Sequence, residues 1–137
     1  MTTEANKEVV RHFYSALQQE DYARAAEFCH PDFIFYLQMD NPIQGAEGFI
    51  ASEKKNFDAF PGFSFQIDAL LAEGDQVAAY LVFDGQHTAA PVDGIEPAGN
   101  RLRFSLLMLL RVVDGKIIEK RAHFDRSDIH RQLSQVA

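Results

Sequence analysis

The hydrophobic positions in the first part of the chain recur at three- and four-residue steps, which is the spacing of amphipathic helices. Residues 6–19 show this spacing clearly, since one side of the segment carries Val9, Val10, Phe13, Tyr14 and Leu17. The pattern predicts three helices, over residues 6–19, 22–29 and 46–59. Asp21 can cap the second helix, and a proline follows the second and third helices closely and ends each of them. The first two helices are expected to pack as a hairpin.

From Phe63 onward the pattern changes to that of β-strands. Tight turns at Gly74-Asp75 and Asp114-Gly115 separate them, and a loop rich in proline and glycine covers residues 90–100. The expected strands are residues 33–37, 63–71, 77–88 and 102–113 and a last segment after Gly115. Three N-terminal helices followed by such strands predict an α+β fold, in which a strongly curved, mostly antiparallel sheet packs on the helices and encloses a pocket.

Composition narrows the class of protein. The 137 residues are 47% hydrophobic and 24% charged, which is typical of a globular protein, and we expect one domain over residues 1–137. No apolar run approaches the ~18 residues of a membrane helix, and the charged N-terminus is unlike a secretory signal, so a cytoplasmic location is expected. The net charge of -7 argues against a nucleic-acid partner. A neutral or apolar small ligand fits this composition.

Two features bear on packing and assembly. The single cysteine, Cys29, excludes an intrachain disulfide and is expected to be a small buried residue. The segment LRFSLLMLLRVV, residues 102–113, is almost wholly apolar, which predicts that both of its faces are buried. One face would meet the helices. The other would meet a second subunit, which predicts a homodimer, or a loop would cover it.

Nucleotide-binding, zinc-protease and serine-hydrolase motifs are absent from the sequence, and the five histidines are scattered, so no metal and no cofactor are expected. His123 and Asp125 stand two apart on an extended segment, which points both side chains to the same face. A carboxylate and an imidazole in an apolar cavity suit proton transfer. Alternatively, Asp125 or Asp128 caps a helix over residues 126–133, and His123 is a rim residue.

Three further residues are candidates for substrate binding. Asp40 offers a second carboxylate just past the strand over residues 33–37; alternatively it is a turn residue that bonds its own backbone. Tyr14 offers a phenol to the pocket, or is a core residue with its hydroxyl at the surface. His87 ends a strand at the edge of the long loop, where it lines the pocket mouth or faces solvent; solvent is the favoured alternative.

Short motifs along the chain carry a family resemblance. Near the end stand Asp114-Gly115-Lys116-Ile117, Glu119, Asp125 and Gln132-Leu133. Upstream stand Ala59-Phe60-Pro61, Glu73-Gly74-Asp75-Gln76-Val77, Gly85-Gln86-His87-Thr88 and Pro97-Ala98-Gly99. In this order they resemble the SnoaL-like polyketide cyclases and ester cyclase-like proteins of the nuclear-transport-factor-2-like superfamily.

The resemblance implies a cone-shaped α+β fold, usually dimeric, with a pocket between the helices and the curved sheet. It also implies that one aspartate near the end of the last strand is the general acid/base of an intramolecular aldol ring closure, without a metal or organic cofactor. Asp125 matches that aspartate, and His123 is carried over as its partner. The chain departs from the family pattern at Arg121, Asp128 and Gln86, which replace tryptophan, glycine and threonine.

Three hypotheses follow. In the first, the protein is a cofactor-independent cyclase or isomerase of an apolar, carbonyl-bearing small molecule, with Asp125 moving the proton and His123, helped by Tyr14 or His87, stabilising the enolate. In the second, Asp40 is the base, as in a ketosteroid isomerase, and Tyr14 donates to the oxyanion. In the third, the protein is a non-catalytic ligand-binding or dimeric interaction module, which is favoured if the pocket is closed or is filled by some of the twelve phenylalanines.

Overall fold

The computed structural model describes residues 2–37 and 41–136. Within these residues, four helices and six strands follow one another in the order α1, α2, β1, β2, α3, β3, β4, β5, β6, α4. Their bounds are α1 Thr3–Gln18, α2 Tyr22–Glu27, β1 Cys29–Tyr36, β2 Pro42–Gln44, α3 Ala46–Asp58, β3 Ser64–Glu73, β4 Gln76–Gln86, β5 Arg101–Val113, β6 Lys116–His123 and α4 Arg126–Leu133. None of the helices in the described part of the chain is long and apolar enough to cross a membrane.

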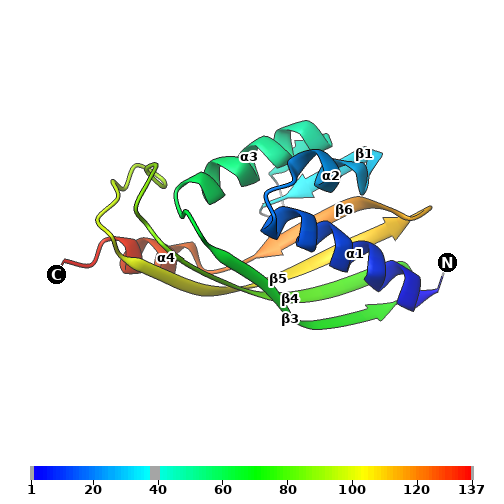
Figure 1. The fold of residues 1–137 in the computed structure, drawn as a ribbon. Helices are drawn as coiled ribbons and strands as arrows, with labels where there is room; N and C mark the ends of the chain where they lie inside the picture. The colour runs from blue at the N-terminus through cyan, green and yellow to red at the C-terminus, as the bar shows by residue number, and fades with distance from the viewer. Residues whose placement is uncertain (1, 38–40, 137) are drawn as a thin grey trace.

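The strands form one open, six-stranded sheet in the order β2-β1-β6-β5-β4-β3. All neighbours are antiparallel except β1 and β6, which run parallel. Figure 1 shows that α1, α2 and α3 lie on one side of the bent sheet, while α4 and the loop between β4 and β5 lie at the end away from the N-terminus. The predicted α+β fold is confirmed, with a fourth helix at the C-terminal end.

The first strand differs most from its prediction. It begins at Cys29, so His30 and Pro31 belong to β1 and do not simply end a helix. Proline is tolerated there because the pairing of β1 with β6 is interrupted between Cys29 and Ile34. The short strand β2, in a region predicted as loop, pairs with β1. Cys29 is buried, as predicted.

Aromatic rings fill most of the space between helices and sheet. Phe49 of α3 is fully buried and contacts Phe13, Phe33 and Phe35, with ring centroids 5.9, 5.4 and 4.9 Å away. A second group stacks toward the other end, where Phe57 and Phe63 are nearly parallel at 4.4 Å. Such pairs stabilise beyond their buried area, by about 0.5–1.5 kcal/mol each. The rings of Phe13, Phe33 and Phe35 hold α3 against α1 and β1.

A β-bulge in β6 determines which side chains face the helices. Arg111 of β5 pairs with Glu119, but the next residue, Val112, pairs with Ile117, so Ile118 is an extra residue. Side chains alternate between faces, and one extra residue therefore reverses the alternation. Ile117 faces the core before the bulge, and Lys120 and Ala122 are buried after it. Without the bulge, the inward positions would carry Glu119, Arg121 and His123.

Candidate active site

A cavity of about 630 Å³ lies between α3, the loop after β4, α4 and the inner face of the sheet. This volume is within the range of small-molecule sites. Six rings line it: Phe35, Phe60, Phe65, Phe83, Phe104 and Phe124. The prediction of a pocket is thus confirmed, and the prediction that phenylalanines fill it is wrong, because the rings form a wall and leave the centre free.

The loop after β4 is held in place at the cavity rim. His130 of α4 lies 2.8 Å from a carboxylate oxygen of Asp93 in the loop. His87 holds the base of the loop: its backbone N–H donates to the carbonyl of Asn100, and its ring Nε2–H donates to the carbonyl of Ala90, at 2.8 Å in both cases. The loop therefore borders the cavity in a defined position.

Lys120 brings an amine to the wall of this cavity. The residue is only 1% exposed, and its Nζ lies 4.6 Å from the ring centroid of Phe35, 4.9 Å from that of Phe49 and 6.0 Å from that of Tyr14. Nζ also donates to the sulfur of Met108 at 3.6 Å, a weak acceptor. These distances are those of cation–π contacts, so the amine lies among ring faces.

Burial changes the protonation of this amine. It lowers the pKa of Lys120 from 10.5 to about 8, although the nearby carboxylate of Glu53 acts in the opposite direction. At pH 7 roughly a tenth of the amine is therefore neutral, against about 0.03% for an ordinary lysine. A neutral amine is both a base and a nucleophile. Buried lysines with lowered pKa values are typical of functional sites.

Glu53 of α3 brings a carboxyl group to the same cavity, and Asp93 of the loop after β4 brings another. Burial raises its pKa above the ordinary value of 4.5, and the charge of Lys120 opposes that rise. Glu53 lies four residues from Phe49 and four from Phe57, both of which are buried on the core side of α3. The cavity therefore holds an acid with raised proton affinity and a base with lowered proton affinity, as acid–base catalysis requires.

Tyr14 is in the core beside this pair. It is 2% exposed, and its hydroxyl has no hydrogen-bond partner among the described residues. Burial raises the pKa of Tyr14 well above 10, and the charge of Glu53 adds to this effect. The alternative of a core tyrosine with its hydroxyl at the surface is wrong, since the hydroxyl is buried. A buried phenol that keeps its proton can act only as a neutral hydrogen-bonding group.

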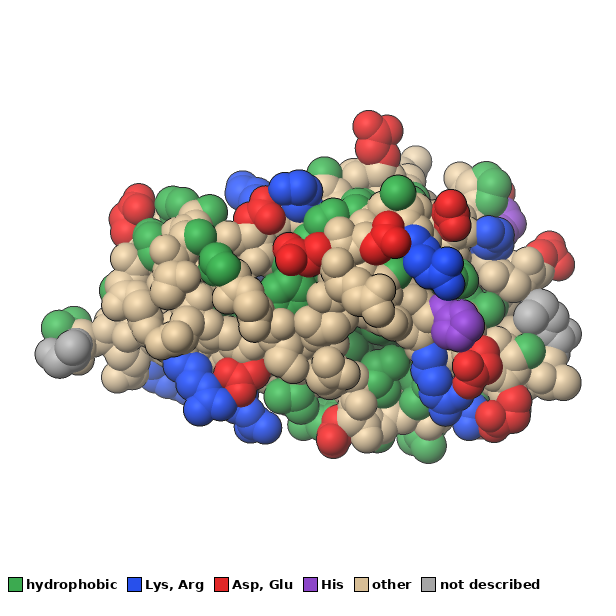
Figure 2. Space-filling model, in the orientation of Figure 1, with side chains coloured by type: hydrophobic (Ala, Val, Ile, Leu, Met, Phe, Trp, Pro, Cys, Tyr) green, Lys and Arg blue, Asp and Glu red, His purple; other side chains and the backbone are tan. Residues whose placement is uncertain are grey.

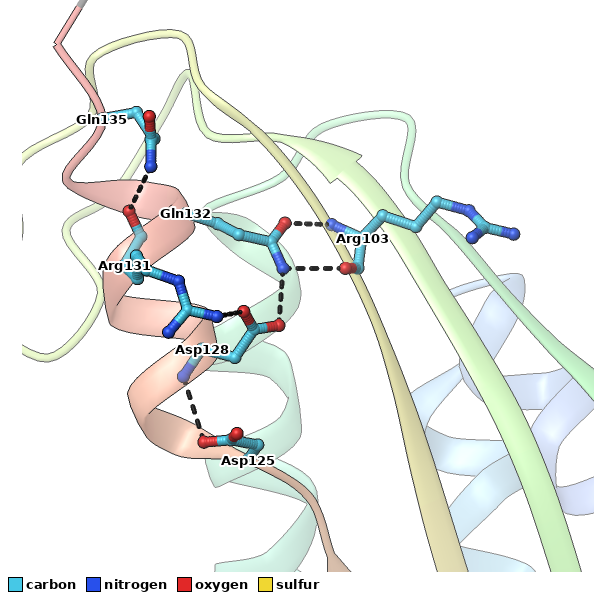
Figure 3. Close-up of polar contacts among 6 residues, drawn as sticks. All are labelled: Arg103, Asp125, Asp128, Arg131, Gln132 and Gln135. Atoms are coloured by element: carbon cyan, nitrogen blue, oxygen red, sulfur yellow. Dashed lines mark hydrogen bonds and ion pairs between the residues drawn. The ribbon is translucent and has the colours of Figure 1, made fainter.

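The structure separates the predicted pair, His123 and Asp125, from the cavity wall. His123 is exposed and pairs with Leu107 on the outward face of the sheet, because the bulge reverses the alternation along β6. Asp125 is exposed and caps α4: its carboxylate accepts the backbone N–H of Asp128 at 3.1 Å, as Figure 3 shows. The predicted alternative, a helix cap at Asp125, is thus confirmed. Ala122 and Phe124 line the cavity beside them.

Polar contacts hold α4 against the sheet. The side chain of Gln132 accepts the backbone N–H of Arg103 and donates to its carbonyl, both at 2.9 Å, and it also donates to Asp128 (Figure 3). Arg131 adds an ion pair to the same carboxylate. Asp125 and Asp128 thus organise one end of the cavity wall without lining it.

The two remaining candidates have different outcomes. His87 is fully buried against the ring of Phe60, so the prediction that it faces solvent is wrong. Its contacts hold the loop, and its binding of a substrate stays a prediction. Asp40 lies outside the described residues, and its predicted role stays untested.

Sequence comparison places the chain in a family. The model of the SnoaL-like polyketide cyclases matches residues 7–133. The chain belongs to the SnoaL-like polyketide cyclase family. A SnoaL-like relative, the nogalonic acid methyl ester cyclase of Streptomyces nogalater, is 34% identical over 119 residues, which are 80% of this chain and 81% of the relative.

Solved structures extend the likeness beyond cyclases. TsrD from Streptomyces laurentii superposes with a TM-score of 0.86 at 25% identity, over 99% of each chain. An LEH-like epoxide hydrolase from Mycobacterium tuberculosis superposes with a TM-score of 0.73 at 22% identity, over 96% of this chain and 90% of its own. The second likeness shows the fold alone. The SnoaL-like fold of this chain is therefore shown, and the chemistry must be inferred from its own cavity.

Proposed function

We propose that the protein is a cofactor-independent cyclase or isomerase that acts on an apolar, carbonyl-bearing small molecule, with Lys120 and Glu53 as the proton-transfer groups. The observation that supports this most is the amine of Lys120, buried among ring faces at the wall of an apolar cavity. The relative from Streptomyces nogalater is named as a cyclase of an ester. The name of this relative supports a carbonyl-bearing substrate for this chain too.

The pair suits proton transfer next to a carbonyl. The neutral amine of Lys120 removes a proton from the carbon beside the carbonyl, and the electron pair moves onto the carbonyl oxygen as an enolate. Glu53, in its protonated form, which burial favours, donates a hydrogen bond to that oxygen. After the enolate carbon forms its new bond, or receives a proton elsewhere, the ammonium of Lys120 returns the proton. Each group then regains its starting state, as a general acid/base must.

Exchange of hydrogen for deuterium tests this function without the natural substrate. β-Tetralone is an apolar bicyclic ketone with exchangeable protons beside its carbonyl. In deuterated buffer, the protein is expected to accelerate the loss of these proton signals in NMR spectra, and Lys120→Met is expected to lose the acceleration by about a hundredfold or more. Lys54→Met, which changes an exposed lysine on α3, is the matched control. Acceleration equal in both variants would contradict the proposal.

Substitutions of Asp125 separate this assignment from the one that the family resemblance implies. Asparagine caps helices as well as aspartate, so Asp125→Asn is expected to change the free energy of unfolding by only a few tenths of a kcal/mol, whereas Asp125→Ala loses about 1 kcal/mol. Chemical denaturation measures both. We expect Asp125→Asn to keep the exchange activity, because the carboxylate is exposed at the cap. A folded Asp125→Asn protein without activity would instead support Asp125 as the general acid/base.

We also propose that the protein is a homodimer through the outward face of the sheet. The exposed large hydrophobic residues of this face are Leu71, Tyr80, Leu107 and Leu109. Tyr80 and Leu107 are direct partners across β4 and β5. Ion pairs of Arg101 and Arg103 with Asp84 and of Arg111 with Asp75 flank this centre along the strands. Figure 2 shows hydrophobic side chains between charged groups on this lower side of the molecule. An apolar centre with a charged rim is the usual anatomy of an interface.

Leu107→Glu tests the interface. Leu107 is 51% exposed, so a charge there is expected to leave the fold intact while it weakens self-association by at least about a hundredfold, the effect of a buried, unpaired charge at an interface centre. Sedimentation velocity over a range of concentrations measures this change. Val136→Glu introduces the same charge at a 94% exposed residue outside the patch and is expected to leave association unchanged. Dimers of equal stability in both variants would exclude this face.

A further inference from the structure

We propose that Lys120 is a covalent amine catalyst, which condenses with the carbonyl of a bound ketone or aldehyde to form an iminium and then an enamine. This inference deepens the proposed function, on which its biological meaning rests. It differs from simple proton transfer because a nitrogen–carbon bond to the substrate forms and breaks in each turnover. Four features of the site support it: the weak partners of the amine, the rings that stabilise a positive charge at its nitrogen, the nearby acid Glu53 and the protonation state of the amine.

No strong hydrogen-bond partner holds the amine of Lys120 among the described residues. Its hydrogen bond in the described structure goes to the sulfur of Met108, at 3.6 Å. Structural lysines in protein interiors are paired with carboxylates or carbonyl groups, since a buried ammonium without them is costly. Here ring faces take the place of such oxygens. Once neutral, this nitrogen has a lone pair that no strong donor occupies, in a residue that lines the cavity.

The rings around the amine can stabilise the positive charge of the covalent intermediate. Phe35 and Phe49 present their faces to Nζ at 4.6 and 4.9 Å. An iminium carries its positive charge at this same nitrogen, so the same rings stabilise the cation that condensation creates. The apolar surroundings also favour the release of water, which condensation requires. The rings are therefore in place before the reaction to stabilise the positive charge of the iminium, a charge that the neutral amine does not carry.

Glu53 can donate and accept the protons that the covalent reaction requires. The amine attacks the carbonyl carbon, the carbonyl electron pair becomes an oxyanion, and one proton moves from the new ammonium nitrogen to this oxygen, giving a neutral carbinolamine. Protonated Glu53 gives a proton to the hydroxyl group, which leaves as water while the nitrogen lone pair forms the iminium. The Glu53 carboxylate then removes a proton from the adjacent carbon, and the electron pair forms the enamine.

The cycle closes without an external reagent. The enamine carbon attacks a second carbonyl of the same substrate, forming the ring bond, and the new oxyanion takes its proton from Glu53. Water then adds to the iminium carbon and gives one proton back to the Glu53 carboxylate. The remaining hydroxyl proton moves to the nitrogen, the carbonyl forms again, and the nitrogen–carbon bond breaks to release the neutral amine of Lys120. No oxidant or reductant takes part, and the net reaction is the ring closure alone.

The protonation state of Lys120 permits the first step. Burial lowers its pKa to about 8, so the nucleophilic form is populated near neutral pH. Two other titratable groups, Glu53 and Cys29, influence it from α3 and β1, and both favour the charged amine. Relative to an exposed lysine, the neutral fraction at pH 7 is larger by a factor on the order of a hundred.

Benzoylacetone, an apolar aromatic diketone, tests the inference directly. Condensation with a neutral lysine gives a stable vinylogous amide, which absorbs in the near ultraviolet and adds the mass of one probe less one water. We expect one label per chain, located on the peptide that contains Lys120, with a rate that rises with pH to a midpoint near 8. Lys120→Met is expected to lose the label, and Lys54→Met to keep it.

The outcomes separate the two proposals. Labelling of exposed lysines at rates similar to that of Lys120, or no label at all, would overturn amine catalysis. If β-tetralone exchange nevertheless depends on Lys120, proton transfer stands alone. A label at Lys120 without exchange of any ketone would support the nucleophile and contradict the cyclase or isomerase function. Reduction with cyanoborohydride in the presence of β-tetralone adds a second readout, since an iminium is trapped as a secondary amine on Lys120.

Discussion

Replacing Lys120 with methionine is expected to stabilise the folded protein by about 3 kcal/mol at pH 7. The pKa of this buried amine falls from 10.5 to about 8, a change of roughly 2.5, and each unit corresponds to 1.36 kcal/mol. That free energy opposes folding as long as the amine is charged in the unfolded chain. Methionine has a similar length and buries no charge, so it removes the cost. The same substitution abolishes the proposed activity.

The pH dependence of stability gives the sign of this effect. The folded pKa of Lys120 is lowered, so between about pH 8 and 10.5 the unfolded state binds more protons than the folded state. The cost is fully present below about pH 8, and it disappears as the pH rises toward 10.5. The free energy of unfolding should therefore rise through this window in the unsubstituted protein relative to Lys120→Met.

Urea denaturation of both proteins at pH 7, 8, 9 and 10 measures the difference, and comparison at each pH cancels the titration of other lysines and tyrosines. Lys54→Met again serves as the control and is expected to change stability by less than about 0.5 kcal/mol, because Lys54 forms an exposed ion pair with Asp58. A Lys120→Met protein that is less stable at every pH would show that the amine stabilises the fold and would contradict the predicted cost of its buried charge.

Phe49→Ala is expected to have the largest effect on stability in the other direction, a loss of about 3–5 kcal/mol. Phe49 is fully buried, and its ring contacts three other phenylalanine rings and the amine of Lys120. Removal of the ring leaves a cavity between α1, α3 and β1. A typical domain is stable by only 5–15 kcal/mol, so thermal unfolding should begin at a markedly lower temperature.

Two variants make this result specific. Ile50→Ala changes the next residue of α3, which is only partly buried, and is expected to cost about 1 kcal/mol. Phe49→Leu keeps most of the volume and should cost less than Phe49→Ala. Since water reaches the amine when the ring is missing, the pKa of Lys120 should also rise, and labelling by benzoylacetone at pH 7 should slow. Equal losses for Phe49→Ala and Ile50→Ala would contradict the central position of this ring.

The fold was largely predictable because the hydrophobic period of each segment is undisturbed. Residues 6–19 and 46–59 match α1 and α3 within a few residues, and the strands from Ser64 to Val113 match the predicted ones. The predictions failed where pairing is irregular. The hydrophobic period does not indicate that Pro31 belongs to a strand, because its place there depends on a break in the pairing of β1 with β6.

The candidate site was less predictable for the same physical reason. A strict alternation along the last strand directs His123 to the cavity, whereas the extra residue at Ile118 directs Lys120 there. The position of a bulge depends on both neighbouring strands, so β6 alone does not reveal it. Glu53 did have a signal, since it interrupts the apolar side of α3 between Phe49 and Phe57. A carboxylate in that place indicates a cavity or a buried partner.

The bulge also means that β6 carries two alternative sets of chemical groups, of which only one faces the cavity. Its inner face presents an amine and a methyl group, Lys120 and Ala122, and its outer face presents Glu119, Arg121 and His123. If residues 119–123 instead continued the alternation that Ile117 sets, with Ile118 paired as an ordinary residue of the strand, the two faces would be exchanged, and a carboxylate, a guanidinium and an imidazole would replace the amine. The pairing register of one strand, with no substitution anywhere, therefore decides which chemical groups the cavity receives.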